Sequence, residues 1–63
     1  MCEANVYLVK NGKEELVLKE VDVITPQNDG LFMKSILGEQ KILDKTRIKE
    51  INLVNHKIII EKI

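Results

Sequence analysis

Turn-forming residues recur at short intervals along this chain and limit the length of every element between them. Asn11-Gly12, Asn28-Asp29-Gly30, Gly38-Glu39 and Asn55-His56 separate segments rich in Val, Ile and Leu, many of which alternate with polar residues. This spacing is too short for ordinary helices and suits strands of about five to seven residues. We therefore predict an all-β fold, with candidate strands at residues 4–10, 15–18, 21–25, 31–37, 40–43, 48–54 and 57–61.

A chain of 63 residues has room for one domain, residues 1–63. About six to seven short antiparallel strands of this size favour a strongly bent sheet or a small barrel, because curling limits the exposed strand edges. We predict an SH3-like or Sm-like barrel. Pro26 is expected to close the strand at 21–25, since proline cannot donate a ladder hydrogen bond. Residues 44–49 are the least strand-like segment and could hold a helical turn instead.

The turn at residues 10–12 leads to a predicted strand register. A three-residue loop with Gly12 in the left-handed conformation places Val6 opposite Leu16, so that apolar side chains share one face. A two-residue Asn11-Gly12 loop would instead set Leu8 opposite Glu15 and mix the two faces. We therefore favour the three-residue loop.

The turn at Asn55-His56 predicts the pairing of the last two strands. A two-residue turn there pairs Leu53 with Ile58 and Ile51 with Ile60, which gives a continuous apolar face. Three apolar residues then remain outside that face and could form a dimer surface: Val54, Ile59 and Ile63.

The size of the chain also points to self-association. Below roughly 70–80 residues a single core rarely supplies more than about 3–5 kcal/mol, so such chains usually need a staple or a partner. Cys2 is the only cysteine, which excludes a disulfide within the chain, and no group of Cys and His has structural-zinc spacing. Self-association is therefore the expected source of additional stability.

The charge pattern gives no reason to expect a nucleic-acid or membrane partner. The formal net charge is +0, although residues 1–31 carry more acids and residues 32–63 more bases. No apolar run approaches the roughly 18 residues of a transmembrane helix, and the first residues lack the pattern of a signal peptide. We expect a cytoplasmic protein in which Cys2 is a reduced thiol.

The side chains available for catalysis are few. Ser35, His56 and Cys2 are the only residues of their types, and the chain has no glycine-rich phosphate loop and no paired-carboxylate signature. A Cys2–His56 dyad would lack an orienting group and an oxyanion site. We therefore predict that the protein is not an enzyme and has no catalytic residues. His56 is read as an exposed turn residue, with a role as a metal ligand left open.

Cys2 stands out because of its position. A lone cysteine is usually a small buried hydrophobe, but the first residues of a domain are seldom well buried. If Met1 is removed, Cys2 offers its amine and its thiolate in one chelate ring. If Met1 is retained, its amine, the Cys2 amide nitrogen and the Cys2 thiolate can bind together. Two symmetry-related copies would close an N₂S₂ square, a geometry that suits nickel(II) or copper(II).

The opening Met1-Cys2-Glu3-Ala4-Asn5-Val6-Tyr7-Leu8, together with the length and strand order, resembles the CooT family of small nickel-binding proteins. The resemblance extends over essentially the whole chain, but only the opening and the apolar strand after it are specific. It implies a homodimer of SH3-like barrels that binds nickel(II) through the cysteine, here Cys2, with main-chain nitrogen of Met1 or Cys2. It also implies delivery of nickel to maturing carbon monoxide dehydrogenase.

We therefore predict a nickel-binding accessory protein, a metallochaperone or nickel reservoir, with Cys2 and Met1 as the metal-binding residues. The alternative is a small RNA-binding barrel, a label also given to members of the family. Its candidate surface is the alternating stripe of Lys45, Arg47 and Lys49, which Asp44 and Glu50 flank. The chain offers only Tyr7 and Phe32 as aromatic stacking platforms, and we expect Phe32 in the core.

Overall fold

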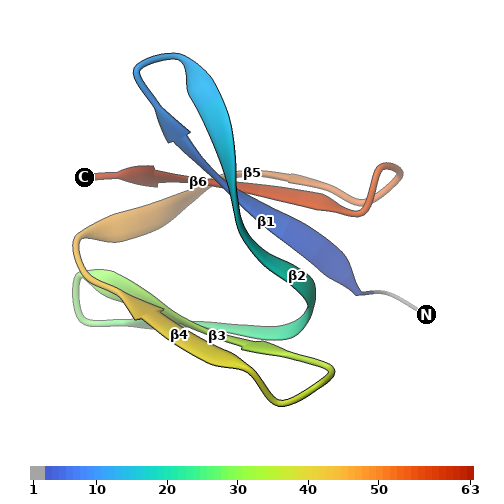
Figure 1. The fold of residues 1–63 in the computed structure, drawn as a ribbon. Helices are drawn as coiled ribbons and strands as arrows, with labels where there is room; N and C mark the ends of the chain where they lie inside the picture. Colours follow the sequence, from blue (N-terminus) through green and yellow to red (C-terminus); the bar gives the residue numbers. More distant parts are fainter. Residues whose placement is uncertain (1–2) are drawn as a thin grey trace.

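The computed structural model describes residues 3–63 and places them in one curled six-stranded sheet. The strands are β1 (Ala4–Lys10), β2 (Lys13–Gln27), β3 (Gly30–Ser35), β4 (Gln40–Leu43), β5 (Thr46–Asn52) and β6 (Lys57–Lys62). They lie in the order β4-β3-β2-β1-β6-β5 and form a half-barrel (Figure 1). The predicted all-β architecture is confirmed.

One strand pairing differs from the prediction. β1 pairs with β6 in parallel, with Val6 opposite Ile58 and Leu8 opposite Ile60, whereas the other neighbouring strands are antiparallel. A uniformly antiparallel barrel is therefore wrong. Parallel neighbours need a long crossover, and here the connection is the rest of the domain, β2 to β5.

The two predicted strands at 15–18 and 21–25 are one long bent strand, β2. It runs from the β1–β2 hairpin, through the middle of the sheet, to β3 in the lower part of the molecule (Figure 1). Pro26 does not close a strand at residue 25, because it pairs with Leu31 near the end of β2. Its missing donor is tolerated there because proline is confined to strand ends, edges and bulges. The helical turn considered for residues 44–49 is also wrong, since β5 begins at Thr46.

The β1–β2 hairpin has the two-residue loop that we rejected. Lys10 pairs with Lys13 across Asn11 and Gly12, whose φ angles of 53° and 76° are both left-handed. The mixed pair of Leu8 with Glu15 does form. Our prediction failed because it assumed an uninterrupted ladder.

Bulges in β2 restore the apolar face after that mixed pair. Tyr7 lies opposite Leu16, but Val6 lies opposite Leu18, so Val17 is an extra residue on β2. Such a bulge shifts the alternation of the strand by one position. It brings Val6 and Leu18 together in the core, where they are 0% and 4% exposed.

The β5–β6 connection also differs from the prediction. Ile51 pairs with Ile58 and Asn52 with Lys57, so residues 53–56 form a four-residue loop and Leu53 belongs to no strand. Ile60 pairs with Ile48 instead of Ile51, because the longer loop shifts the register by two residues and a bulge at Lys49 shifts it by one more. The three residues predicted outside the core differ in their exposure: Val54 and Ile63 are exposed, and Ile59 is half-buried.

The core lies inside the curl of the sheet. Its buried apolar members come from β1, β2, β3 and β6: Val6, Leu18, Val21, Leu31, Met33 and Ile60. On β3 the alternation is strict, with Leu31, Met33 and Ser35 buried. Phe32 lies between two of these inward positions and is only half-buried, so the expectation that it belongs to the core is wrong.

The β4–β5 connection packs back onto the start of β3. The Thr46 N–H donates to the carbonyl oxygen of Asp29 (3.0 Å), and the Thr46 hydroxyl donates to that of Leu43 (2.9 Å). A Cβ atom on Gly30 would overlap the carbonyl oxygen of Leu43. These contacts fix the open side of the half-barrel, and Thr46 is buried as a result.

Candidate functional site

The two predicted metal-binding residues, Met1 and Cys2, lie outside the described residues. The candidate site is therefore built from the residues that surround the start of β1. Glu3 is the first of these, and it follows Cys2 directly in the chain. Glu3 lines a pocket together with three other side chains.

Asn5 connects the start of β1 to two other parts of the sheet. Its main-chain N–H donates to the carbonyl oxygen of His56 (2.9 Å), and its Oδ1 accepts a hydrogen bond from the Glu20 N–H (3.1 Å). His56 ends the β5–β6 loop, and Glu20 lies in the irregular part of β2. Asn5 therefore holds two segments that are far apart in the sequence.

His56 and Glu20 share an uncommon backbone conformation. Both have φ angles of 52°, in the left-handed region that residues other than glycine adopt infrequently. Their carbonyl groups are engaged, that of His56 by Asn5 and that of Glu20 by the Ile36 N–H at 2.8 Å. The hydrogen bonds to the surrounding sheet therefore fix the backbone positions from which these two side chains project.

Glu3, Asn5, Glu20 and His56 line a polar pocket of about 290 Å³. Glu3 and Asn5 are half-buried, whereas Glu20 and His56 are exposed. The lining holds two carboxylates and an imidazole but no lysine or arginine. An environment of this kind favours a cation over an anion.

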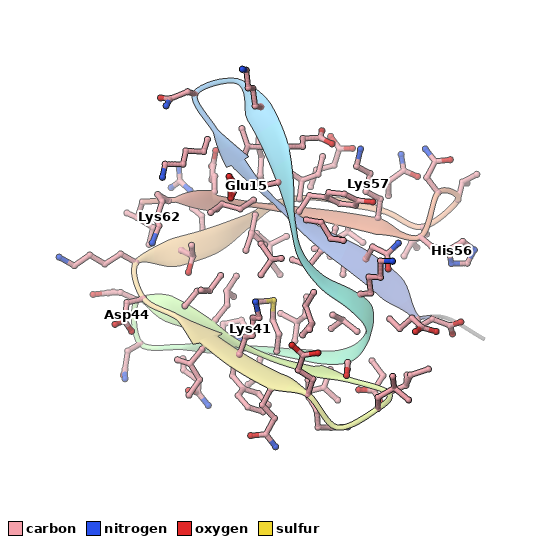
Figure 2. The ribbon with its side chains drawn as sticks, viewed as in Figure 1. Glu15, Lys41, Asp44, His56, Lys57 and Lys62 are labelled. Carbon is pink, nitrogen blue, oxygen red and sulfur yellow. The ribbon has the colours of Figure 1, made fainter. Side chains whose placement is uncertain are left out.

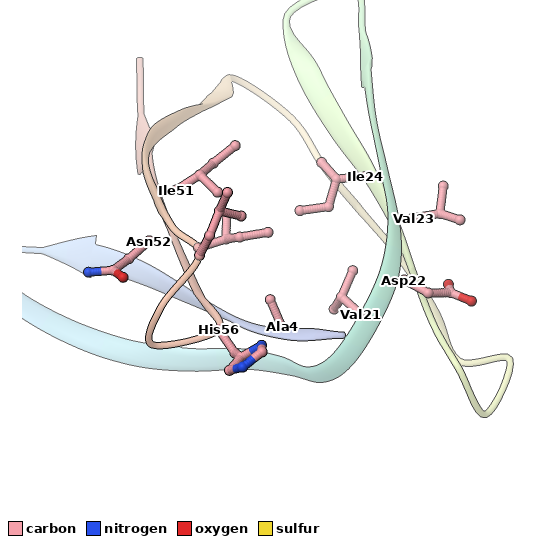
Figure 3. Close-up of a pocket in the computed structure, with 10 residues that line it drawn as sticks. Ala4, Val21, Asp22, Val23, Ile24, Ile51, Asn52 and His56 are labelled. Atoms are coloured by element: carbon pink, nitrogen blue, oxygen red, sulfur yellow. The ribbon is translucent and has the colours of Figure 1, made fainter. Parts of the chain in front are cut away.

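The same histidine borders a second, apolar pocket of about 280 Å³. This pocket lies between the bend of β2 and the β5–β6 loop (Figure 3). Ala4, Val21 and Ile24 face into it, while Asp22 points to the other side of β2 (Figure 3). Ile51 and Leu53 at its border are 52% and 80% exposed. Apolar surface is therefore exposed next to the start of β1.

The described residues do not by themselves form a metal site. Within residues 3–63 no three His, Cys, Asp or Glu side chains are arranged to hold a metal ion. The donor types around the polar pocket nevertheless fit nickel(II), which accepts imidazole nitrogen and carboxylate oxygen. A site at this end of the molecule therefore needs donors in addition to Glu3, Glu20 and His56.

The basic stripe considered for RNA binding is interrupted. The Arg47 Nε–H donates to Glu61 Oε2 at 2.9 Å, so a carboxylate offsets its charge. Lys49 is the bulged residue of β5, and Lys45 lies in the bend before the strand, with a φ of 52°. Tyr7 carries Lys57 over its ring, with the ammonium 4.9 Å from the ring centre. These features do not form a stacking platform flanked by free cations.

Ser35 has a structural part in a turn. Its hydroxyl accepts hydrogen bonds from the N–H groups of Leu37 (3.3 Å) and Glu39 (3.1 Å). It is buried. The only serine of the chain therefore stabilises the β3–β4 hairpin.

His56 lies in an exposed turn, as predicted, and its side chain projects at the β5–β6 loop (Figure 2).

The other members of the polar pocket could hardly be predicted from the sequence. Asn5 and Glu20 belong to different strands, and the Glu20 position depends on irregular pairing between Ala4 and Val6 of β1 and their partners. Alternation patterns do not predict such irregularities. Only the turn-forming character of Asn55-His56 pointed to an exposed histidine.

Comparison with known proteins assigns the chain to a family. The family model described as CO dehydrogenase accessory protein CooT matches residues 1–61. The chain belongs to the CooT family. An accessory protein supports the work of another protein, so membership implies a non-catalytic role for this CooT protein.

A solved structure agrees with this assignment. The crystal structure of a protein assigned as CooT from Carboxydothermus hydrogenoformans superimposes with a TM-score of 0.90. The two sequences are 40% identical, and the match covers 98% of each chain. No curated protein sequence matches this CooT protein. Residues 3–63 contain no helix with the length and hydrophobicity needed to cross a membrane.

Proposed function

We propose that this CooT protein binds nickel(II) through the Cys2 thiolate and main-chain nitrogen of Met1 or Cys2. It would act as a metallochaperone or nickel reservoir, with carbon monoxide dehydrogenase as the client during maturation. The observation that carries the proposal is the family match, which begins at residue 1 and so includes both proposed ligands. The cation-favouring pocket beside Glu3 supports it.

The chemistry of the N-terminus supports the same metal. Thiolate and nitrogen donors in one plane suit nickel(II) or copper(II), and the N-terminal residues can supply both donor types from one short segment. These groups must lose protons to bind, so affinity should rise with pH. The proposed location is the cytoplasm, where the thiol stays reduced.

We further propose that the protein is a homodimer of single-domain chains. A core of this size needs additional stabilisation, and several exposed apolar side chains are available for contact. They include Leu37, Ile42, Leu53, Val54 and Ile63, each between 67% and 87% exposed. A second copy could also add a second Cys2 thiolate to the same metal.

Nickel titration of the untagged protein tests the proposal. Wild-type protein should bind nickel(II) at micromolar concentrations and develop a thiolate-to-nickel absorption band in the near ultraviolet. The Cys2→Ala variant should lose both the binding and the band. Equal binding by the two proteins would refute Cys2 as a ligand, and absence of binding by the wild type would refute the nickel function.

The matched control is Cys2→Ser, which keeps the size of the side chain but replaces sulfur with oxygen. It should behave as Cys2→Ala does, because a hydroxyl is a much poorer ligand for these metals than a thiolate. Intact mass with and without nickel would show whether Met1 is retained and how many metal ions each assembly holds.

A further inference from the structure

We propose that the end of the molecule where β1 begins docks a protein segment that carries apolar side chains flanked by lysine or arginine. The surface consists of the apolar pocket beside the bend of β2, the β5–β6 loop that borders it, and the polar pocket that shares His56 with it. Together these are termed the docking face. The inference goes beyond the proposed function and depends neither on nickel nor on residues 1 and 2.

The first argument is the exposure of apolar side chains around this end. Val54 and Leu53 in the β5–β6 loop are 87% and 80% exposed. Leu37, which is 85% exposed, belongs to the β3–β4 hairpin at the same end of the molecule (Figure 1). These are the three most exposed large apolar residues within residues 3–63. Single exposed apolar residues are ordinary, but their concentration at one end indicates an interaction surface.

The second argument is the apolar pocket itself. Leu53 borders it, and the side chains of Ala4, Val21 and Ile24 face into it (Figure 3). Its volume of about 280 Å³ is just below the range of about 300–1,000 Å³ typical of small-molecule sites, and it suits an aliphatic side chain of a docked segment. A partner can therefore bury an apolar side chain in the pocket and cover the loop beside it.

The third argument is the charge around the face. No lysine or arginine lines either pocket. Glu3 and Glu20 line the polar pocket, and neither belongs to the ion pairs found within residues 3–63. Asp22 also borders the apolar pocket, but Lys34 pairs with it at 3.3 Å. Complementary charge therefore favours a partner segment with lysine or arginine next to its apolar residues.

The same carboxylates argue against other occupants. Nucleic acid or anionic lipid would meet like charge at Glu3 and Glu20. In a two-fold dimer a surface patch meets itself, so these two carboxylates would approach their counterparts on the second copy. Two exposed residues outside the docking face remain available to the proposed homodimer, namely Ile42 and Ile63.

Titration with three synthetic peptides, followed by nuclear magnetic resonance, tests the chemistry of the partner. In the first peptide a leucine is flanked on both sides by lysines, in the second alanine replaces the leucine, and in the third glutamates replace the lysines. The leucine–lysine peptide should shift the amide signals of the β5–β6 loop, and added salt should weaken its binding. The alanine peptide should bind about tenfold more weakly, and the glutamate peptide should not bind. Any other ranking, or no shift with the leucine–lysine peptide, would overturn the inference.

A double substitution locates the binding surface on the protein. Leu53→Ser combined with Val54→Ser should keep the fold, because both side chains are exposed in a loop, and should weaken binding of the leucine–lysine peptide about tenfold. The control is Ile63→Ser at the opposite end of the molecule (Figure 1), where 67% of the residue is exposed. It should bind as wild type does. Unchanged binding by the double variant would refute the docking face.

A second double substitution tests the charge. Glu3→Gln combined with Glu20→Gln should weaken binding of the leucine–lysine peptide and make it less sensitive to salt. The control, Asp44→Asn, changes a carboxylate in the β4–β5 connection and should leave both properties unchanged. A salt dependence that stays the same in the Glu3 and Glu20 variant would contradict the inference.

Sedimentation of the Leu53 and Val54 variant distinguishes a second copy from a different partner. The variant should keep the oligomeric state of the wild type, because the docking face is assigned to another protein. If a wild-type dimer instead dissociates when these two residues are replaced, the second copy occupies the face and the inference is wrong.

Discussion

The main-chain N–H of Asn5 donates a 2.9 Å hydrogen bond to the carbonyl oxygen of His56. Through this bond the first strand of the sheet is joined to the loop that precedes the last strand. The side chain of the same asparagine accepts from the Glu20 N–H at 3.1 Å. One residue therefore connects the three segments around the start of β1, next to the polar pocket.

Replacing Asn5 should reveal this organising role. In Asn5→Ala the Glu20 N–H loses its acceptor, and we expect the free energy of unfolding to fall by about 0.5–1.5 kcal/mol, the usual net value of one hydrogen bond. Urea denaturation measures the change. Gln40→Ala, at an exposed position of the edge strand β4, serves as the control and should change stability by less than about 0.5 kcal/mol. Similar values for the two variants would contradict the role given to Asn5.

The close approach at Gly30 leads to a second prediction. A methyl group there would collide with the Leu43 main chain, so Gly30→Ala should either force the β4–β5 connection away from β3 or fail to fold. We expect a loss of about 2 kcal/mol or more, as for other overpacked sites, measured by thermal or urea unfolding.

Gly38→Ala is the comparison for Gly30→Ala. An added Cβ at Gly38 meets no atom within 4 Å, but its φ of 92° is unfavourable for alanine. The expected cost is about 1–2 kcal/mol, from backbone conformation alone. A Gly30→Ala protein at least as stable as Gly38→Ala would show that the packing at Leu43 does not limit the fold.

The surface pair between Lys57 and Glu14 predicts a pH dependence. The two side chains are 2.6 Å apart, and the hydrogen bond to Glu14, the first cause, raises the pKa of Lys57 above its ordinary value of 10.5. A lysine with a raised folded-state pKa adds stability that is fully present below the unfolded pKa. That stability is lost as the pH rises through the folded pKa.

Comparison of wild type with Lys57→Gln measures this effect. The difference in their free energies of unfolding should stay constant from about pH 8 to 10 and shrink above the unfolded pKa of about 10.5. Lys19→Gln, which alters a lysine outside the three ion pairs of residues 3–63, corrects for the general effects of high pH. A difference that persists unchanged at the highest pH would contradict the assigned interaction.

The strands were predictable from the sequence because turn residues and apolar alternation are local signals. The β1–β2 register was not, since it depends on extra residues in β2 that let the two-residue turn at Asn11-Gly12 coexist with an apolar pair of Val6 and Leu18. At the other hairpin, Leu53 looked like a core residue by its alternation with Ile51. It lies in a four-residue loop instead.

The candidate site was predictable only in part. Cys2 could be predicted as a candidate ligand because its thiolate and main-chain nitrogen donors are adjacent in the chain. The family resemblance then indicated nickel as the candidate metal. Glu20 and His56 are 36 positions apart in the numbering, and only the pairing of β1 with both β2 and β6 brings them to one pocket. Pairing between distant strands leaves no periodic trace in a single sequence.

The parallel pairing of β1 with β6 has a consequence for the order of events during synthesis. Residues 57–62 must leave the ribosome before β1 gains its second neighbour, so folding waits on a contact between strands near the two ends of the sequence. Contacts of such large sequence separation form late and slowly compared with hairpins. His56 joins Asn5 in that same late step. The polar pocket lined by Glu3, Asn5, Glu20 and His56 should therefore be complete only after the last strand has left the ribosome.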